Sequence, residues 1–461
     1  MTNCDRSAPS AEPPARAEPP ASTEQLSPTP SRTRAPTLAR TPARTNPAAR
    51  VAALPAWRRK LHRWRHRVVH QAVRRLKRTS FGVWLVGRVR HIVSKMANRQ
   101  PGSANSATST GLPILGIIAP KFVTTDIRIT PLTRLCERLG LLTPQRITAR
   151  QLASGADQTE YAAILVHRNG VVPSDLPGLL RYLAKTDTRL VVELDDDMIS
   201  AAGRARLTTK SAHTQAGLGA LITLCQHADL VIVSTEPLAQ EVRYISTAPV
   251  FVQPNLLDPD LWLTPSANFG GAPSPPPIRL LYYGTAQHGA DLAVIKELPA
   301  RLTATLGQNV IVELCGVTLG SLPPGFVSLF STDFPYPDFV EFLRSQQGRW
   351  SVGLAPLVPD AINTSKSDIK LLEYAALGVP AVASRVGPYA DADQLAVLVS
   401  NRPDCWVGAV ERLLADPAFA QQRTQAAARY VHGTRMLSPL AAERWANLVL
   451  GVRQAAQKPF S

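Results

Sequence analysis

The segment 363–384 (NTSKSDIKLLEYAALGVPAVAS) combines residue types that could bind an anion and a sugar. The Thr-Ser pair at 364–365 favours the start of a helix, which would place Lys366 and Ser367 in the first turn. A helix start offers free backbone N–H groups and the positive end of the helix dipole, and both attract an anion such as a diphosphate. Glu373 follows about two turns later and could bind a pair of sugar hydroxyls. We therefore expect a site for a ligand that carries both a diphosphate and a sugar.

The same segment predicts a helix that ends at a glycine and is followed by a buried strand. Its apolar residues recur at helical spacing, Gly378 is a typical C-terminal stop, and Pro380 cannot continue a helix. Residues 381–384 then form the apolar run of a short buried strand. An ordinary amphipathic helix packed on a sheet would explain these apolar residues. It would not explain the charged and polar residues at 366–368 and at Lys370 beside them.

This pattern resembles the donor-binding helix of GT-B glycosyltransferases, in particular the large retaining family that includes sucrose synthases and many bacterial polysaccharide enzymes. In that family two acidic residues separated by seven others bracket the helix start, and a strand similar to 381–384 follows. Glu373 matches the second acid, whereas Ser365 occupies the place of the first. The form N-x-x-K-S-D-I-K-x-L-E-Y is similar to a subgroup of bacterial surface-polysaccharide transferases. The resemblance covers residues 112–452 and implies a nucleotide-diphosphate sugar as donor.

A second motif of this resemblance lies in residues 283–291, which match the first strand and loop of the donor-binding domain. Many relatives place an Arg and a Lys there to contact the diphosphate. In this chain His288 is the nearest candidate, and Lys366 would take over the cationic role. The donor-binding residues that the resemblance implies are Gly284, Thr285, His288, Lys366 and Ser367 at the diphosphate and Glu373 at the ribose.

Three acidic residues, 195–197, end a predicted strand in the first half of the chain. They contain the D-x-D spacing with which one-domain GT-A transferases bind a divalent metal. GT-B enzymes need no such metal, so the resemblance places this run in the cleft, where Asp196 would be a catalytic residue or contact the acceptor. A purely structural cap would explain the run equally well. We expect no metal site, and no cofactor apart from the nucleotide sugar, which is a substrate.

His167 and Arg168 follow the second predicted strand and Arg128 follows the first. Ligands of parallel sheets bind beyond the carboxyl ends of the strands, so these side chains are expected at the same cleft. His167 could be a catalytic base on the acceptor side, although a partly buried structural histidine would explain it equally well. Arg168 and Arg128 would contact the acceptor or an acidic ligand. A solvated loop would also explain Arg128.

Positive charge is concentrated near the N-terminus of the chain, whose formal net charge is +17. Residues 57–100 contain 14 Lys or Arg and no acidic residue, whereas residues 101–461 contain 30 basic and 30 acidic residues. Residues 1–56 are rich in Pro, Ala, Arg and Ser/Thr. They contain too few large apolar residues to bury a core, so we expect them to be disordered. The net charge therefore says nothing about the substrate of the folded part.

Residues 57–100 predict a basic amphipathic helix, because apolar residues recur at helical spacing with Arg and Lys between them. The tryptophans and the basic residues are typical of a helix that lies on an anionic membrane surface. Two alternatives remain open, a helix that packs on the body or on a second subunit and a nucleic-acid patch. We favour an anionic membrane surface as the partner of residues 57–99 and expect no nucleic acid.

The remaining sequence predicts an α/β fold in which apolar strands and helices alternate. We predict two Rossmann-like, doubly wound domains, an acceptor domain at 111–266 and a donor-binding domain at 277–437, joined by a Gly/Pro/Ser-rich bridge at 267–277. A closing helix at 438–455 would cross back to the first domain, as in GT-B enzymes. The predicted strands are 112–119, 161–166, 189–194, 229–234, 250–252, 278–283, 310–315, 350–355 and 381–384.

The five cysteines are scattered and form no C-x-x-C pair, which suits a reducing compartment. The N-terminus lacks the apolar run of a secretory signal, and no run of about 18 apolar residues predicts a transmembrane helix. No P-loop, H-E-x-x-H or G-x-S-x-G motif is present. We expect a cytoplasmic protein at the inner face of the cell membrane.

These observations lead to one predicted function and two alternatives. The resemblance implies a metal-independent, retaining transferase that moves a sugar from a nucleotide-diphosphate donor to a glycan or lipid-linked acceptor, in surface polysaccharide synthesis. The first alternative is an inactive GT-B-fold binding or scaffold protein, because Ser365 replaces an acid. The second is a GT-A-type metal enzyme centred on 195–197.

Overall fold

The computed structural model describes residues 111–208, 212–262, 277–284, 289–317, 321–330 and 335–452. The predicted tail 1–56, the predicted basic helix 57–100 and most of the bridge 267–277 lie outside these residues. So do Thr285 and His288. No helix within the described ranges is long and apolar enough to cross a membrane.

The first half of the described chain contains a six-stranded sheet in which every pair of neighbouring strands is parallel. The strand order is β2-β1-β3-β4-β5-β6, so the order reverses between β1 and β3. Such a reversal creates a crevice at the carboxyl ends of the two strands, where doubly wound sheets bind ligands. The strands are β1 (Ile114–Ile118), β2 (Thr143–Arg146), β3 (Ala163–His167), β4 (Arg189–Leu194), β5 (Leu230–Val233) and β6 (Val250–Val252).

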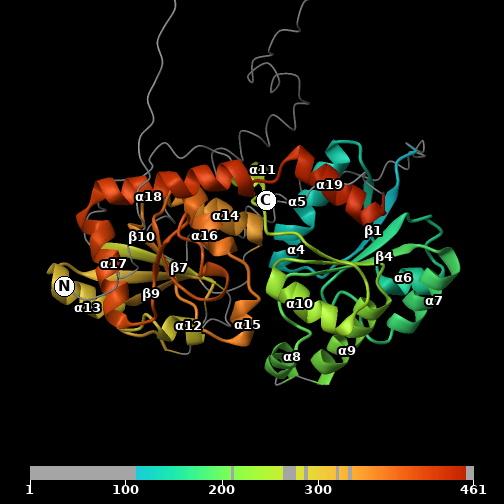
Figure 1. Cartoon of the computed structure of the whole chain (residues 1–461), viewed down its shortest axis with the longest axis horizontal. Helices are drawn as coiled ribbons and strands as arrows, with labels where there is room; N and C mark the ends of the chain where they lie inside the picture. The colour runs from blue at the N-terminus through green and yellow to red at the C-terminus, as the bar shows by residue number, and fades with distance from the viewer. Residues whose placement is uncertain are drawn as a thin grey trace, which may run out of the picture. The chain divides into compact units, whose positions relative to one another are not determined.

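Helices cover both faces of this sheet because its strands are apolar on both sides. In β4, Leu190 and Val192 pack in one core cluster with residues of α6, α7, α9 and α10, whereas Val191 packs in another with residues of α5 and α19 (Pro439–Leu450). Figure 1 shows α5 and α19 on one side of this sheet and α9 and α10 on the other. The helices of this half are α4 (Val123–Arg128), α5 (Thr130–Arg138), α6 (Ala149–Ser154), α7 (Leu176–Thr186), α8 (Ala201–Thr208), α9 (Ala212–His227), α10 (Glu236–Ile245) and α11 (Pro259–Trp262).

The second half contains another fully parallel six-stranded sheet, ordered β12-β11-β10-β7-β8-β9. Its order reverses between β7 and β10, which is the strand order of dinucleotide-binding folds. The strands are β7 (Ile278–Tyr283), β8 (Val310–Cys315), β9 (Phe326–Phe330), β10 (Val352–Ala355), β11 (Ala381–Ser384) and β12 (Val397–Val399). The helical segments are α12 (Gly289–Ala293), α13 (Leu298–Leu306), α14 (Tyr336–Ser345), α15 (Ala361–Thr364), α16 (Ile369–Leu377), η1 (Gly387–Tyr389), α17 (Pro403–Ala415), α18 (Pro417–Tyr430), the π-helical turn η2 (Val431–Arg435) and α19 (Pro439–Leu450).

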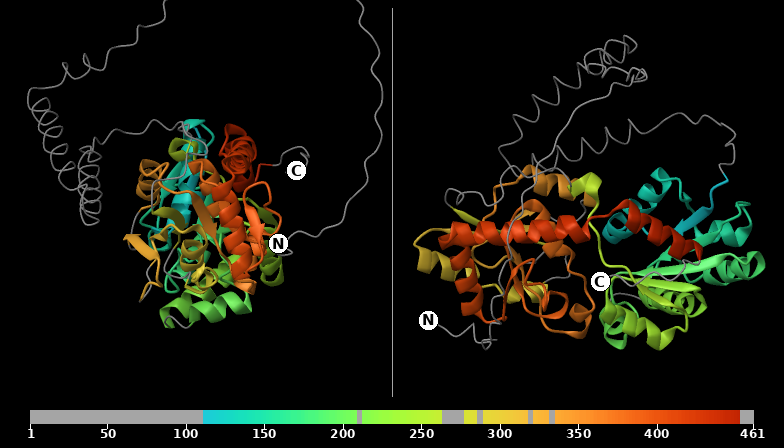
Figure 2. Two further views of the ribbon diagram at one scale, coloured as in Figure 1. Left: turned by 90° about the vertical axis from the view of Figure 1, so that its left-hand side faces the viewer. Right: turned by 45° about the horizontal axis from the view of Figure 1, so that its top comes forward.

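The last helix, α19, packs on the first sheet. Trp445 of α19 is 1% exposed and packs in the core cluster that holds Leu132 of α5 and the strands of the N-terminal sheet. Figure 2 shows α19, coloured red, against these elements from two further sides. The segment that follows β6 and the segment that precedes α19 lie side by side. Leu257 N donates to Arg435 O (2.8 Å), and Leu437 N donates to Leu257 O (2.9 Å).

The observed fold confirms two Rossmann-like domains, and it differs from the predicted elements at several places. The apolar spacing of residues 292–306 predicts one helix, whereas the structure has two helices there, α12 and α13. Three strands, β2, β9 and β12, were not predicted, and each lies at an edge of its sheet. Edge strands in this protein are short or partly exposed, so the continuous apolar pattern of a buried strand is absent from them.

Candidate functional site

The helix start predicted at 364–365 is wrong, because the segment contains two helices separated by a short connection. Asp360 caps α15 by accepting a hydrogen bond from Asn363 N (2.6 Å), and α15 ends at Thr364. The second helix, α16, begins only at Ile369. Lys366 and Ser367 therefore lie in the connection before α16 and not in its first turn. We call residues 365–368 the donor loop.

The C-terminal end of α16 agrees with its prediction. Gly378 has a φ of +73° and follows the last helical residue, Leu377, and this left-handed conformation favours glycine. The buried strand β11 then occupies the predicted residues 381–384.

Lys366 is largely buried near the carboxyl ends of β7 and β10, where the strand order of the second sheet reverses. Its side chain is 19% exposed, and its Nζ lies 3.8 Å from Asp291 Oδ2. Burial lowers the pKa of Lys366, and the positive charge of Arg206 lowers it too, whereas Asp291 and Asp196 raise it. Because Asp196 follows β4 of the first sheet, the donor loop and the acidic run at 195–197 act on each other electrostatically.

Asp291 is fixed by the loop that follows β10. Its Oδ1 accepts hydrogen bonds from Val358 N (3.0 Å) and from Asn363 Nδ2 (3.2 Å). Asn363 also donates to Val358 O (3.0 Å). This network holds a carboxylate beside Lys366.

The donor loop also contacts the first half of the chain. Thr235 Oγ1, at the start of α10, donates to Ser365 O (2.9 Å). Asn255 Nδ2 donates to Ser367 Oγ (2.7 Å). These two hydrogen bonds hold the loop against residues that follow β5 and β6.

Glu373, predicted to bind the ribose, is 3% exposed and accepts a 2.6 Å hydrogen bond from Tyr336 OH. Burial raises the pKa of Glu373 to about 7, and it outweighs the opposite effects of the hydroxyls of Tyr336 and Tyr283 and of the charge on Lys370. In this structure the carboxyl group therefore faces tyrosines. The ribose contact stays a prediction.

Gly284, predicted at the diphosphate, directly follows β7 and donates from its backbone N to Cys315 O (3.1 Å). Its own carbonyl lies 2.7 Å from the position that a Cβ on Gly316 would occupy. Gly316 has a φ of +75°, so both space and conformation require a glycine beside Gly284.

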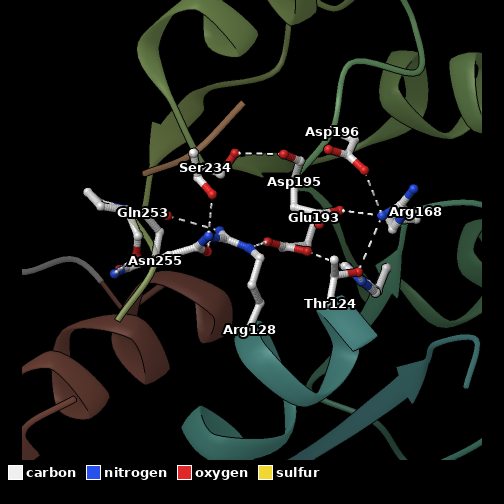
Figure 3. Close-up of polar contacts among 12 residues, drawn as sticks. Thr124, Arg128, Arg168, Glu193, Asp195, Asp196, Ser234, Gln253 and Asn255 are labelled. Atoms are coloured by element: carbon white, nitrogen blue, oxygen red, sulfur yellow. Dashed lines mark hydrogen bonds and ion pairs between the residues drawn. The ribbon is translucent and has the colours of Figure 1, made fainter. Parts of the chain in front are cut away.

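In the first half, Arg128 lies inside the protein and not on a solvated loop. It is 5% exposed and extends from the end of α4. Its Nε donates to Glu193, its Nη1 donates to Asn255 Oδ1 (2.6 Å) and its Nη2 donates to Gln253 O (2.9 Å). Figure 3 shows this guanidinium between Glu193 and Asn255. All three guanidinium nitrogens are engaged, so the predicted contact with an acceptor stays a prediction.

His167 is fully buried at the end of β3, with both ring nitrogens engaged. Nδ1 is hydrogen-bonded to Glu193, and Nε2 lies 3.1 Å from Thr124 Oγ1. Burial alone would raise the pKa of Glu193, but the neighbouring Arg128 and His167 lower it to about 2. Glu193 is therefore a buried carboxylate that orients a histidine and an arginine.

Arg168 connects the same cluster to the acidic run at 195–197 (Figure 3). Its Nη1 donates to Asp195 Oδ1 (3.0 Å) and Asp196 Oδ2 (3.1 Å), and its guanidinium lies 4.8 Å from the centroid of the Phe122 ring. Arg168 has a φ of +53°, a strained conformation for a residue with a side chain, at the carboxyl end of β3. Strain of this kind often occurs at functional sites.

The three acidic residues at 195–197 have three different environments. Asp195 is buried, and burial raises its pKa while Arg168 lowers it. Asp196 has a side chain that is 46% exposed. Asp197 accepts hydrogen bonds from Ile199 N (3.2 Å) and Ser200 N (2.9 Å). For this residue of the run, the contacts are those of the structural alternative. Within the ranges that the structure describes, no group of three or more His, Cys, Asp or Glu residues could hold a metal ion.

Several residues of the site were not predicted as site residues, although Asp291 falls in the motif at 283–291. Each of them contacts a predicted site residue or the donor loop from a distant part of the sequence. They are Thr124, Glu193, Asn255, Asp291 and Arg435. Glu193 carries the one signal that sequence reasoning could have used, because it is a charged residue inside an apolar strand.

No protein-family model matches the chain, and no curated protein matches its sequence. Solved structures do match. Sucrose-phosphate synthase from Thermosynechococcus elongatus aligns with a TM-score of 0.51 at 14% identity, over 73% of this chain and 98% of that one. An α-glucosyltransferase in complex with UDP-glucose and DNA aligns with a TM-score of 0.49 at 11% identity, over 73% and 99%. The α,α-trehalose 6-phosphate synthase from Burkholderia multivorans aligns with a TM-score of 0.45 at 15% identity, over 73% and 83%.

The likeness to sucrose-phosphate synthase shows the fold. The chain has the two-domain GT-B architecture, as its two doubly wound sheets also indicate. The alternative of a one-domain GT-A enzyme is therefore wrong.

Proposed function

We propose that this protein is a glycosyltransferase that uses a nucleotide-diphosphate sugar as donor. The observation that carries the proposal is the position of the donor loop 365–368. It lies beside the point where the second sheet reverses its strand order, and it is hydrogen-bonded to Thr235 and Asn255 of the first half. Residues at the carboxyl ends of both sheets therefore lie next to each other, and a transferase needs its two substrates to be held in such proximity.

On the donor side, Lys366 and Ser367 bind the diphosphate together with the segment that begins at Gly284 and includes Thr285 and His288. Departure of the nucleotide diphosphate develops negative charge. An oriented ammonium group and backbone N–H groups stabilise that charge without a metal ion. Glu373 binds the ribose once its carboxyl group turns away from Tyr336.

On the acceptor side, Asp196 is the carboxylate that a substrate can reach, because its side chain is 46% exposed. It contacts the acceptor hydroxyl and takes part in catalysis, and Arg168 orients it. His167 acts from a buried position through Thr124, which also accepts a hydrogen bond from Arg168 (3.3 Å). Burial of Arg128 and His167 favours orienting roles for both over contact with the substrate.

For the acceptor we propose a glycan or a lipid-linked glycan in surface polysaccharide synthesis, with retention at the anomeric carbon. Both follow from the resemblance of segment 363–384 to bacterial polysaccharide transferases. The basic residues 57–99 would bind an anionic membrane surface at the inner face of the cell membrane and so bring the enzyme to such an acceptor.

Calorimetric titration of the full chain with UDP, GDP, ADP and TDP, with and without EDTA, tests the donor site. We expect one diphosphate to bind in both conditions. Hydrolysis or transfer of the matching nucleotide sugars then tests catalysis. Binding without turnover of any sugar would favour an inactive GT-B-fold scaffold, and failure of all four diphosphates to bind a folded protein would overturn the proposal.

A further inference from the structure

Lys370 is a buried ammonium group that no described carboxylate or hydrogen-bond acceptor contacts. It lies in the first turn of α16 and is 9% exposed. Its Nζ is 4.2 Å from the centroid of the Tyr282 ring and 5.7 Å from that of Tyr283. Ring faces attract a cation, but they replace lost hydration incompletely, and a buried charge is costly unless an anion pairs with it. Among the described residues, Lys370 therefore has no carboxylate in direct contact with its ammonium group.

Asp291, the first of two carboxylates that act on Lys370 electrostatically, is already engaged. Its Oδ1 accepts hydrogen bonds from Val358 N and Asn363 Nδ2, and its Oδ2 faces Lys366 Nζ at 3.8 Å. It therefore pairs with Lys366 and leaves Lys370 with only a longer-range attraction.

Glu373, the second carboxylate, lies three residues further along α16 and accepts a hydrogen bond from Tyr336 OH. Burial lowers the pKa of Lys370 to about 7, and the positive charge of Lys366 lowers it further, against the attraction of Asp291 and Glu373. The two lysines therefore repel each other. Their combined positive charge is larger than the negative charge of the carboxylates available to pair with them.

The position of Lys370 also bears on the donor site. The segment 284–291 after β7 (GTAQHGAD) contains no Lys or Arg. Tyr283 OH donates to Lys370 O (3.0 Å), which fixes the first turn of α16 to the end of β7. Lys370 thus brings a positive charge to this strand end from a helix.

We infer that Lys370 is a second cationic contact for the donor's diphosphate, beside Lys366, and that the diphosphate supplies the anion that Lys370 lacks. This inference rests on the proposed function, since it concerns the same donor site. A diphosphate can neutralise both lysines at once, which neither engaged carboxylate does.

Proton uptake on binding would follow from this arrangement. In the free protein Lys370 is partly neutral at and above about pH 7, and a bound diphosphate would favour its charged form. Affinity for the nucleoside diphosphate should therefore fall as the pH rises above about 7. The phosphate group of the ligand cannot cause this uptake, because its second pKa is about 6 and a cationic site favours its ionised form.

Calorimetry of the full chain with the diphosphate that binds, at about pH 8 in two buffers of different ionisation enthalpy, measures this uptake directly. Lys370→Met retains length and apolar volume, and Lys185→Met on the exposed end of α7 is the matched control. We expect Lys370→Met to weaken binding of the diphosphate at least about tenfold and to abolish the uptake, with the affinity for the parent nucleoside unchanged.

Wild-type affinity and proton uptake that are both retained in Lys370→Met would overturn this inference while leaving the proposed function intact. Absence of diphosphate binding to the wild type would overturn both. If Lys370→Met does not fold, the wild-type titration still decides, because binding without proton uptake at about pH 8 contradicts a role for Lys370.

Discussion

The side-chain amide of Asn255 donates a 2.7 Å hydrogen bond to Ser367 Oγ and so connects the residues after β6 to the donor loop. The same amide group accepts from Arg128 through its Oδ1 (2.6 Å), and the backbone carbonyl of Asn255 accepts from Arg435 Nη2 (3.1 Å). Arg435 in turn forms a two-pronged ion pair with Asp368, with both N–O distances 2.7 Å. Asn255 is thus the junction between the buried acceptor-side cluster and the donor loop.

We predict that Asn255→Ala destabilises the protein more than Ser367→Ala does. The alanine at 255 leaves the guanidinium of Arg128, which is 5% exposed, without one of its acceptors, at a cost of about 1–3 kcal/mol. Ser367→Ala removes one hydrogen bond from a partly exposed hydroxyl, at about 0.5–1.5 kcal/mol. Urea unfolding of the two variants measures the difference. Equal losses would mean that Asn255 does not support Arg128.

The sequence predicted the fold well where a strand is central and buried. Five predicted strands have the observed bounds: 189–194, 250–252, 278–283, 310–315 and 381–384. Four of them lie inside their sheet, where mostly apolar residues pack in a core on both faces, and 250–252 is an apolar strand at an edge. The missed strand β2 (TPQR) has no fully buried residue, so its place beside β1 depends on tertiary pairing. Local pattern cannot reveal such a strand.

The candidate site was predicted in part, for a related reason. His167 and Arg168 at the end of β3 and Asp196 after β4 lie close together, as expected from their positions at the carboxyl ends of neighbouring strands. The partners that define their roles are distant in sequence, since Arg128 and Glu193 are 65 residues apart. Burial of Arg128 depends on such a partner, and a single sequence does not show pairing across that distance.

Asp196 and Asp197 provide a matched pair of variants that separates catalysis from stability. Asp196 is half exposed and pairs with Arg168, so Asp196→Asn should change the free energy of unfolding by at most about 1 kcal/mol while abolishing most glycosyl transfer. Asp197 caps two backbone N–H groups, so Asp197→Ala should cost about 0.5–2 kcal/mol and leave turnover per folded molecule near that of the wild type. Steady-state rates and urea unfolding of both proteins are the measurements. Normal turnover by Asp196→Asn would remove Asp196 from the mechanism.

Glu193 should make the protein sensitive to acid. Its folded-state pKa of about 2 lies below the ordinary value of 4.5, because Arg128 and His167 outweigh the effect of burial. A lowered carboxylate pKa contributes stability above the ordinary value, and this contribution is lost as the pH falls from about 4.5 toward 2. Glu193→Gln should flatten that part of the stability profile and, by leaving Arg128 without its anion, cost about 3–5 kcal/mol near neutral pH. Thermal unfolding across this pH range measures both effects, and an unchanged acid limb in the variant would contradict the assignment.

Lys366→Met should weaken binding of the nucleoside diphosphate about tenfold or more without unfolding the protein. The side chain of Lys366 is 19% exposed, and its Nζ lies 3.8 Å from Asp291, whose carboxylate retains hydrogen bonds from Val358 and Asn363 without it. Its main effect would therefore be on an anionic ligand. Calorimetric titration beside Lys185→Met, which removes an exposed lysine of α7, gives the comparison. If the two variants bind the diphosphate equally well, the diphosphate does not contact Lys366.

Lys370→Met should stabilise the ligand-free protein, in contrast to most substitutions of buried residues. The folded-state pKa of Lys370 is lowered by burial from 10.5 to about 7, so the unfolded chain binds more protons between these values, and wild-type stability should rise with pH across that interval. Methionine removes the buried charge and the pH dependence together. We expect a gain of about 1–4 kcal/mol at and below about pH 7 that shrinks at higher pH. Chemical unfolding without nucleotide at several pH values measures it. A loss of stability at every pH would instead mean that the contacts of Lys370 with the rings of Tyr282 and Tyr283 stabilise the fold. In that case the buried lysine would be explained by its packing, without an anionic ligand.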